Sequence, residues 1–166
     1  AFYHTHGLPS RFMVSPACEP DNLDQKLAER GYHIDAPTDV QWADSTTVEL
    51  SLQNIHKAEL LAEPDMDWMG VYMEGVADRH EMSVKRDLIR RIGADYVVAR
   101  VDLDGGPVSV GLGVFDQGWT GIFCMHTLNK HRRLGFAGAV LGALTRWGRE
   151  QGGDRMYLQV ERDNPV

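Results

Sequence analysis

Nine residues in the second half of the chain, Lys130 to Gly138, combine three Lys or Arg side chains with two glycines. They stand between a predicted strand and a predicted helix. Helix N-termini leave backbone N–H groups unpaired and carry a partial positive charge, so such a turn can bind an anion. Gly135 would let the backbone approach a phosphate, and the small Ala137 and Gly138 would leave the first turn uncovered. An ordinary loop with a solvated basic face is the alternative that spacing alone leaves open.

Other patterns that could do chemistry are incomplete. The chain has no GxxxxGK[ST] sequence, which excludes a P-loop. Gly111 and Gly113 lie inside a predicted strand, and Asp116 stands where a dinucleotide fingerprint needs its third glycine. The His-Glu pair at 80–81 is followed by Val84 where a zinc-binding HExxH motif needs histidine.

The remaining histidine and cysteine candidates also favour ordinary structural roles. His4 and His6 could share a metal ion, but no third ligand is near in the sequence, so we expect no metal. Cys124 lies within an apolar run, which indicates a small buried side chain rather than a nucleophile. With Cys18 it makes only two cysteines, too few for a disulfide framework and typical of a reducing cytosol.

The first half of the chain predicts short strands and helices. Apolar alternation and turn residues predict three strands, at Arg11–Ser15, Asp39–Ala43 and Thr46–Leu52. Capping residues predict a helix at Leu23–Arg30. A second helix is predicted after Pro64, with Met66, Met69 and Met73 at helical spacing on one side. A third is predicted at Asp78–Ile92, with Leu88, Ile89 and Ile92 on its buried side. Residues 54–63 are compatible with either loop or helix.

The second half gives a more regular pattern. Two Gly-containing turns, at 104–106 and 116–118, separate three predicted strands at Tyr96–Leu103, Pro107–Phe115 and Trp119–Thr127. A helix, Gly135–Gln151, then crosses over to a strand at Met156–Glu161. The order predicts an α/β fold with a mixed, mostly antiparallel central sheet flanked by helices. We expect the free edge of the last strand to be covered by a partner chain, by residues 1–44 or by a segment beyond Val166.

The basic loop carries a family resemblance. Arg132-x-x-Gly135-x-Ala137 resembles the [QR]xxGx[GA] signature of the GCN5-related N-acetyltransferases (GNAT), whose loop amides bind the pyrophosphate of acetyl-CoA. The long helix, the strand at 157–160 and Asn164 resemble the family's sequence downstream of that signature, so the likeness covers roughly residues 46–166. It implies an acyl-CoA N-acyltransferase fold, incomplete at its C-terminus. The implied reaction is transfer of the acetyl group from acetyl-CoA to a primary amine by direct attack.

The resemblance also assigns site residues. Its implied cofactor-binding set is Met125, His126 and Thr127 beside the pantetheine and thioester, and Lys130, Arg132, Arg133, Leu134, Gly135, Phe136, Ala137, Gly138 and Asn164. The resemblance implies that a backbone N–H within Met125–Thr127 would polarise the thioester carbonyl. His126 is the catalytic candidate because imidazole can take a proton near neutral pH, and a structural role beside the pantetheine is the alternative. Glu74 and Asp67 are candidates for acceptor contacts, with a solvated acidic face as the alternative.

Two departures from the family pattern stand out. A helix with a tyrosine general acid and two further strands normally follow the asparagine, whereas this sequence ends at Val166. Asn129 occupies a position where the family usually has proline. Residues 1–44 resemble the end of a GNAT domain, so we interpret them as an N-terminal extension or the tail of a degenerate upstream repeat, and residues 45–166 as the acetyltransferase domain.

Composition limits the classes of partner. Of the 166 residues 43% are hydrophobic and 25% charged, which is typical of a globular protein. Residues 1–83 hold 5 basic and 15 acidic side chains, and residues 84–166 hold 12 and 9. This balance disfavours nucleic-acid binding. The acidic first half could concentrate a cationic acceptor, and a role in solubility is the alternative.

The apolar runs are shorter than the roughly 20 residues of a membrane helix, so we expect a cytoplasmic protein that does not bind membranes. Its expected partner is a small-molecule or peptide amine, and the sequence also leaves open a homodimer or association with a preceding repeat. The alternative function is a non-catalytic acyl-CoA-binding module acting as a sensor or dimerisation domain.

Overall fold

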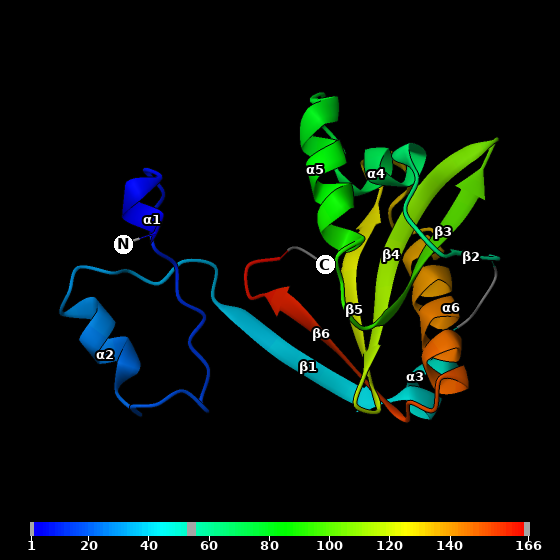
Figure 1. Ribbon diagram of the computed structural model, residues 1–166. Coiled ribbons are helices and arrows are strands. Elements are labelled where there is room, and N and C mark those ends of the chain that lie inside the picture. The colour runs from blue at the N-terminus through cyan, green and yellow to red at the C-terminus, as the bar shows by residue number, and fades with distance from the viewer. Residues whose placement is uncertain (1, 53–55, 165–166) are drawn as a thin grey trace. The chain divides into compact units, whose positions relative to one another are not determined.

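The computed structural model describes residues 2–52 and 56–164, and the chain divides into two units, Ala1–Pro37 and Thr38–Val166 (Figure 1). Unit 1 contains two short helices, α1 (Phe2–Thr5) and α2 (Leu23–Ala28). The second lies where the sequence predicts a helix, and Gly31 follows it with a positive φ of 83°.

The strand predicted at Arg11–Ser15 is wrong, because these residues have no regular secondary structure. A strand is stable only when its backbone groups pair with a neighbouring strand. The described part of unit 1 offers none, so the local apolar alternation has no partner.

Unit 2 is built on one six-stranded sheet in the order β1-β6-β5-β4-β3-β2. All neighbouring pairs are antiparallel except β5 and β6, which are parallel. The predicted mixed, mostly antiparallel sheet is therefore confirmed. The strands are β1 (Thr38–Asp44), β2 (Glu59–Leu61), β3 (Asp95–Leu103), β4 (Gly106–Asp116), β5 (Trp119–Thr127) and β6 (Arg155–Glu161).

The outer edge of β6 is covered by β1, over a register that runs from Thr38 opposite Glu161 to Asp44 opposite Arg155. The expectation that a segment within residues 1–44 could cover this edge is confirmed. The structural division lies between Pro37 and Thr38, so the last part of the predicted extension is an integral strand of unit 2.

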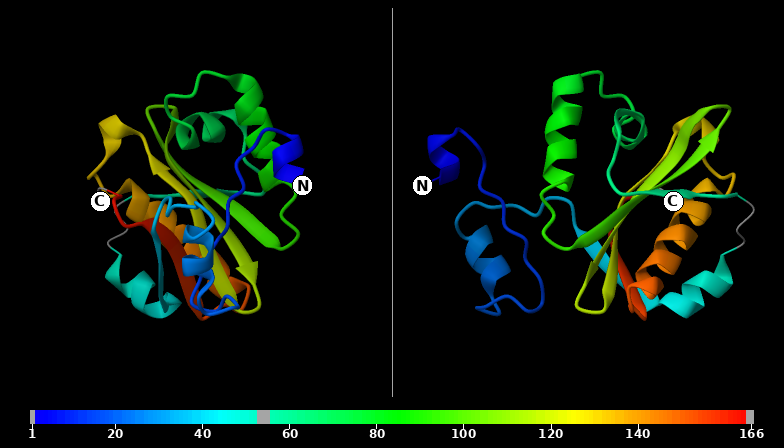
Figure 2. Two further views of the ribbon diagram at one scale, coloured as in Figure 1. Left: turned by 90° about the vertical axis from the view of Figure 1, so that its left-hand side faces the viewer. Right: turned by 45° about the vertical axis from the view of Figure 1, so that its right-hand side comes forward.

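Helices cover both faces of the sheet (Figure 2). On one face α6 (Phe136–Glu150) packs on β3, β4 and β5, and α3 (Ser45–Ser51) packs on α6. On the other face α4 (Met66–Tyr72) packs on β4 and β5, with α5 (Arg79–Ile89) against it. Trp68 and Met69 are fully buried under α4, and Val140 and Leu144 are fully buried under α6.

Three further expectations need correction. Within residues 54–63, expected to be loop or helix, Glu59–Leu61 form the strand β2 by pairing with β3. The segment Thr46–Leu52 is not a strand but belongs mostly to α3, where Val48 packs on the core and Leu50 is 83% exposed. Alternation over so short a segment fits one side of a helix as well as one face of a strand. Leu88, predicted on the buried side of its helix, is 57% exposed, whereas Ile89 is buried.

Candidate functional site

The parallel strands β5 and β6 separate partway along their length (Figure 1). Their described pairing runs only from Trp119–Arg155 to Ile122–Leu158. A bulge follows in β5, where Cys124 has a positive φ of 51° and the register with β4 shifts at Gly111. A Cβ on Gly111 would lie 2.5 Å from the Met125 sulfur, so only glycine fits here without rearrangement.

Thr127 presents its backbone to the side of β5 that β6 has left. Leu128 donates its N–H to Val108 of β4 at 2.9 Å. Because backbone groups alternate in direction along a strand, the N–H of Thr127 points away from β4. Its carbonyl accepts a hydrogen bond from Arg132 Nε at 3.3 Å. The N–H can therefore donate to a ligand beside the end of β5.

The loop after β5 has the backbone that an anion site requires. It passes through a short 3-10 helix, η1 (Asn129–His131), and then through two left-handed residues, Arg133 with φ 66° and Gly135 with φ 87°. Gly135 is the N-cap of α6 and no side chain caps that end. Successive N–H groups in such a turn form a concave anion-binding surface.

The side chains of this loop differ in exposure. Phe136 is one of the predicted site residues, but its side chain is buried at 4% exposure. It can therefore contact a ligand only through its backbone. Gly138 is half-buried beside Leu52. The side chains of the other predicted loop residues are exposed: Lys130, Arg132, Arg133, Leu134 and Ala137.

The structure brings His126 and Glu74 together. The carboxylate of Glu74 lies just after α4, and its Oε2 is 3.0 Å from His126 Nε2. The backbone N–H of Asn129 donates to the same carboxylate, at 3.0 Å to Oε2 and 3.2 Å to Oε1. Both side chains are about one-quarter exposed. The His126 hydrogen bond is the main cause that lowers the pKa of Glu74, so this carboxyl is ionised at neutral pH.

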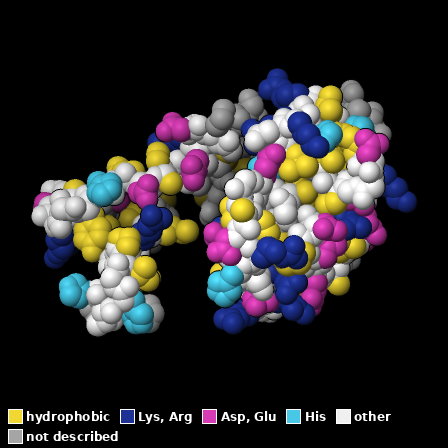
Figure 3. Space-filling model, turned by 90° about the horizontal axis from the view of Figure 1, so that it is seen from above, with side chains coloured by type: hydrophobic (Ala, Val, Ile, Leu, Met, Phe, Trp, Pro, Cys, Tyr) yellow, Lys and Arg dark blue, Asp and Glu magenta, His cyan; other side chains and the backbone are white. Residues whose placement is uncertain are grey.

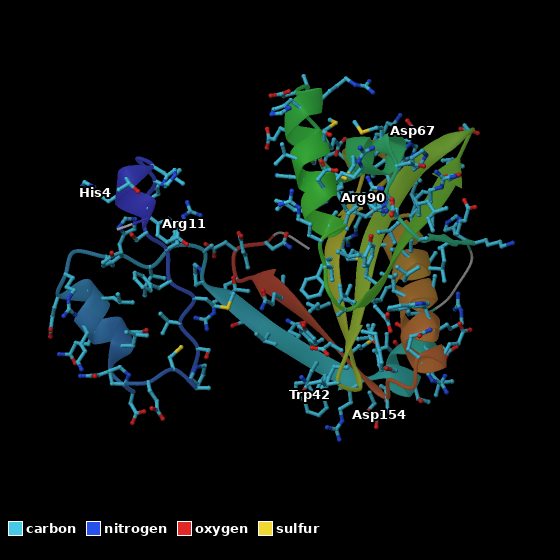
Figure 4. All side chains as sticks on the ribbon, in the orientation of Figure 1. His4, Arg11, Trp42, Asp67, Arg90 and Asp154 are labelled. Carbon is cyan, nitrogen blue, oxygen red and sulfur yellow. The ribbon has the colours of Figure 1, made fainter. Side chains whose placement is uncertain are left out.

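Asp67, the other predicted acceptor contact, is exposed on α4 (Figure 4). Within the described residues it takes part in no salt bridge, unlike several neighbouring carboxylates. On the face of unit 2 seen in Figure 3, acidic, basic and hydrophobic side chains are mixed. Asp67 and Glu74 therefore occupy different environments, the first free in solvent and the second paired.

His56 is a site residue that sequence reasoning missed. Its Nε2 donates to the carbonyl of Leu134 at 2.9 Å, and its ring centroid lies 4.2 Å from that of Phe136. It thus supports the loop from a segment 78 positions earlier in the chain. No motif surrounds His56, so the sequence carries no local signal of this contact.

Cys124 lies on the side of β5 that faces α4. Burial is the main cause that raises its pKa, so it remains a thiol at neutral pH. The side chain of Tyr72 forms a hydrogen bond with Cys124 and is also partly buried. This burial raises the pKa of Tyr72 to about 12. Both groups are neutral near pH 7, and Cys124 is a half-buried thiol rather than the fully buried side chain that the sequence indicates.

The remaining candidates lie elsewhere. Asn164 is exposed in the turn after β6 and its backbone N–H donates to Glu161 at 3.0 Å. His4 belongs to α1 of unit 1.

Among residues 2–52 and 56–164, no three His, Cys, Asp or Glu side chains gather as a metal site would require. No helix in the same ranges is long and apolar enough to cross a membrane.

We expect Glu74→Gln to lower the melting temperature at neutral pH but not at low pH. Because folding lowers the pKa of Glu74 below its ordinary value of 4.5, its ionised form stabilises the fold above that pH. The stabilisation is lost as pH falls through the folded-state pKa, where the wild-type side chain becomes as neutral as glutamine. Thermal melts of both proteins from about pH 7 down to about pH 2 measure this difference. A difference that did not shrink on acidification would contradict the pairing.

This chain has the fold of solved GCN5-related N-acetyltransferases, with a mixed sheet whose parallel pair separates beside a strand–loop–helix turn. More particularly, it belongs to the family described as "Probable histone acetyltransferase Rv0428c C-terminal", which matches residues 1–166.

Individual relatives agree with this assignment. The chain is 26% identical over 169 residues to an uncharacterized N-acetyltransferase, YobR, of Bacillus subtilis (strain 168), covering 98% of this chain and 67% of that protein. A GCN5-related N-acetyltransferase from Kribbella flavida has a TM-score of 0.62 at 16% identity, over 87% of this chain and 57% of that one. A tandem GNAT protein from the clavulanic acid biosynthesis pathway has a TM-score of 0.63 at 15% identity, over 95% and 54%. This chain therefore spans little more than half of these two structures.

Proposed function

We propose that this chain transfers an acetyl group from acetyl-CoA to a primary amine. Bound acetyl-CoA would supply the acetyl thioester that the amine attacks. The observation that carries the proposal is the outward-facing N–H of Thr127, at the end of β5, directly before the left-handed turn into α6. The Thr127 N–H and the left-handed turn thus follow each other along the chain. One ligand that carries a thioester and a pyrophosphate could contact both, the thioester at the N–H and the pyrophosphate at the turn.

The residues present fit this ligand. Arg133 to Gly138 would hold the pyrophosphate through backbone N–H groups, because α6 begins at a glycine without a side-chain cap. Lys130 and Arg133 are exposed and would add positive charge beside the phosphates. Thr127 would donate its N–H to the thioester oxygen, where negative charge develops.

His126 would act as the general base, since it lies next to Thr127 in β5. In the transfer, the lone pair of the amine forms the new bond to the acetyl carbon. The carbon–sulfur bond breaks and its electron pair goes to the sulfur of CoA. The amine proton goes to the imidazole of His126 and then to the thiolate or to solvent.

We further propose that the acceptor is a cationic amine. The family is described by histone acetylation, and lysine-bearing histones are cationic. Residues 38–83 carry ten acidic side chains and two basic ones. Many of these carboxylates are paired with Arg or His, so the exposed Asp67 is the clearest candidate to attract a cation.

The test is release of the CoA thiol from acetyl-CoA in the presence of different amines. We expect turnover with lysine peptides or polyamines, and a fall in kcat/KM for these acceptors as salt screens the attraction. Anionic amino acids of similar size serve as matched controls. Acetyl-CoA binding without thiol release from any amine would instead identify a non-catalytic module. A preference for anionic acceptors would remove the argument from charge.

A further inference from the structure

The carboxylate of Glu74 joins three segments of unit 2. It follows α4, and it contacts the ring of His126 on β5 and the backbone of Asn129 at the start of η1. Fifty-two and fifty-five positions separate these partners from Glu74 in the sequence. An ionised carboxylate bonded in two directions is held in place, and it therefore holds the ring that it contacts.

The proton on this hydrogen bond can be assigned. An ionised carboxylate only accepts hydrogen bonds, so His126 Nε2 must be the donor. In neutral imidazole the other ring nitrogen, Nδ1, then carries a lone pair instead of a hydrogen. The Glu74 contact thus decides which nitrogen of His126 can take a proton.

The bond from Asn129 depends on the residue type at that position. Proline has no backbone N–H and could not donate to Glu74. Asn129 supplies this donor, at 3.0 Å to Oε2 and 3.2 Å to Oε1, so the anchor of Glu74 depends on a residue other than proline at position 129.

We propose that Glu74 is a positioning residue that, anchored by the N–H of Asn129, fixes the ring of His126 with hydrogen on Nε2 and leaves Nδ1 to accept the proton of the amine. This inference rests on the proposed function. Arg132 of the loop also acts on the charge of Glu74, and as a cation it cannot accept a hydrogen bond from His126 Nε2.

The test combines NMR with kinetics on the whole chain. In nitrogen-15 spectra we expect a slowly exchanging Nε2–H signal of His126, identified by its loss in His126→Gln. Glu74→Ala should abolish that signal and lower kcat about 10- to 100-fold, since a misplaced catalytic group can cost that much. KM for acetyl-CoA should be unchanged. Glu74→Gln keeps an oxygen that can accept from Nε2, so it should keep the signal and lose less of kcat.

Asn129→Pro is the second variant. Leu128 has φ −48° and ψ 134°, a conformation that a following proline favours, and position 129 opens a helix. We expect the protein to fold, with a weaker Nε2–H signal and a smaller loss of kcat than in Glu74→Ala.

The outcomes separate this inference from the proposed function. The positioning role would be overturned if Glu74→Ala changed neither the Nε2–H signal nor kcat. If Glu74→Ala does not fold, the same result in Asn129→Pro would overturn it. In either case the proposed acetyl transfer would be unaffected. If the wild type transferred acetyl to no amine, both the proposed function and the catalytic part of the inference would fall. The NMR signal alone would then decide whether Glu74 holds the ring.

Discussion

Replacing His126 with glutamine should lower kcat/KM for acetyl transfer by about 100- to 10,000-fold, the usual contribution of a general base. Glutamine is similar in size and can still donate to Glu74, whose carboxylate lies 3.0 Å from the imidazole nitrogen. It cannot take a proton from the amine at neutral pH. The expected loss therefore reports proton transfer rather than disruption of the fold. Steady-state kinetics at saturating acetyl-CoA measure it.

Acetyl-CoA binding is the control for this variant. The turn proposed to bind the pyrophosphate begins at Arg133, seven residues after His126, so calorimetry should give a similar Kd in both proteins. His131→Gln is a matched substitution, because this half-buried histidine lies in the loop and packs edge-on to Phe136. An equal loss of kcat in the two variants would show that His126 has no special role in proton transfer.

The second half of the fold could be predicted closely from the sequence because its signals are local. The turn at Asp104 and Gly105 has both residues at positive φ, as a tight hairpin of this kind requires, and glycine permits it. The strands on either side lie within one residue of their predicted bounds. The long helix likewise shows its period of 3.6 over fifteen residues, enough to identify it.

The errors fall where the decisive partner lies far away in the sequence. The segment at Ser45–Ser51 is a helix because Val48 packs on the core cluster around α6, about 90 positions later. Arg11–Ser15 is not a strand because no neighbouring strand exists in the described part of unit 1. Alternation is only a local signal, and in both segments tertiary contacts decided the outcome.

The candidate site divides in the same way. The loop from Lys130 to Gly138 could be proposed as a site from the sequence because its basic residues and glycines are consecutive in the chain. His126 and Glu74 were both candidates, but nothing in the sequence indicates that they form a pair, since 52 positions separate them. The support of the loop by His56 was missed for the same reason.

Replacing Gly135 with valine should weaken acetyl-CoA binding by about tenfold or more, equivalent to about 1.4 kcal/mol. Gly135 has φ 87°, a left-handed conformation that costs other residues about 1–2 kcal/mol and β-branched residues most. Valine would either move the loop out of this conformation or place its side chain where the N–H groups should meet the pyrophosphate. Isothermal calorimetry with acetyl-CoA measures the change in Kd.

Gly152→Val is the matched control for that variant. Gly152 has φ 94° at the opposite end of α6, and a Cβ there would meet no atom within 4 Å. It therefore carries a similar backbone cost with no clash and no connection to the turn before α6. We expect both variants to melt at a lower temperature, but only Gly135→Val to lose affinity for acetyl-CoA. If both lost affinity equally, general destabilisation would explain the effect; if neither did while folded, the turn at Gly135 would not be the pyrophosphate site.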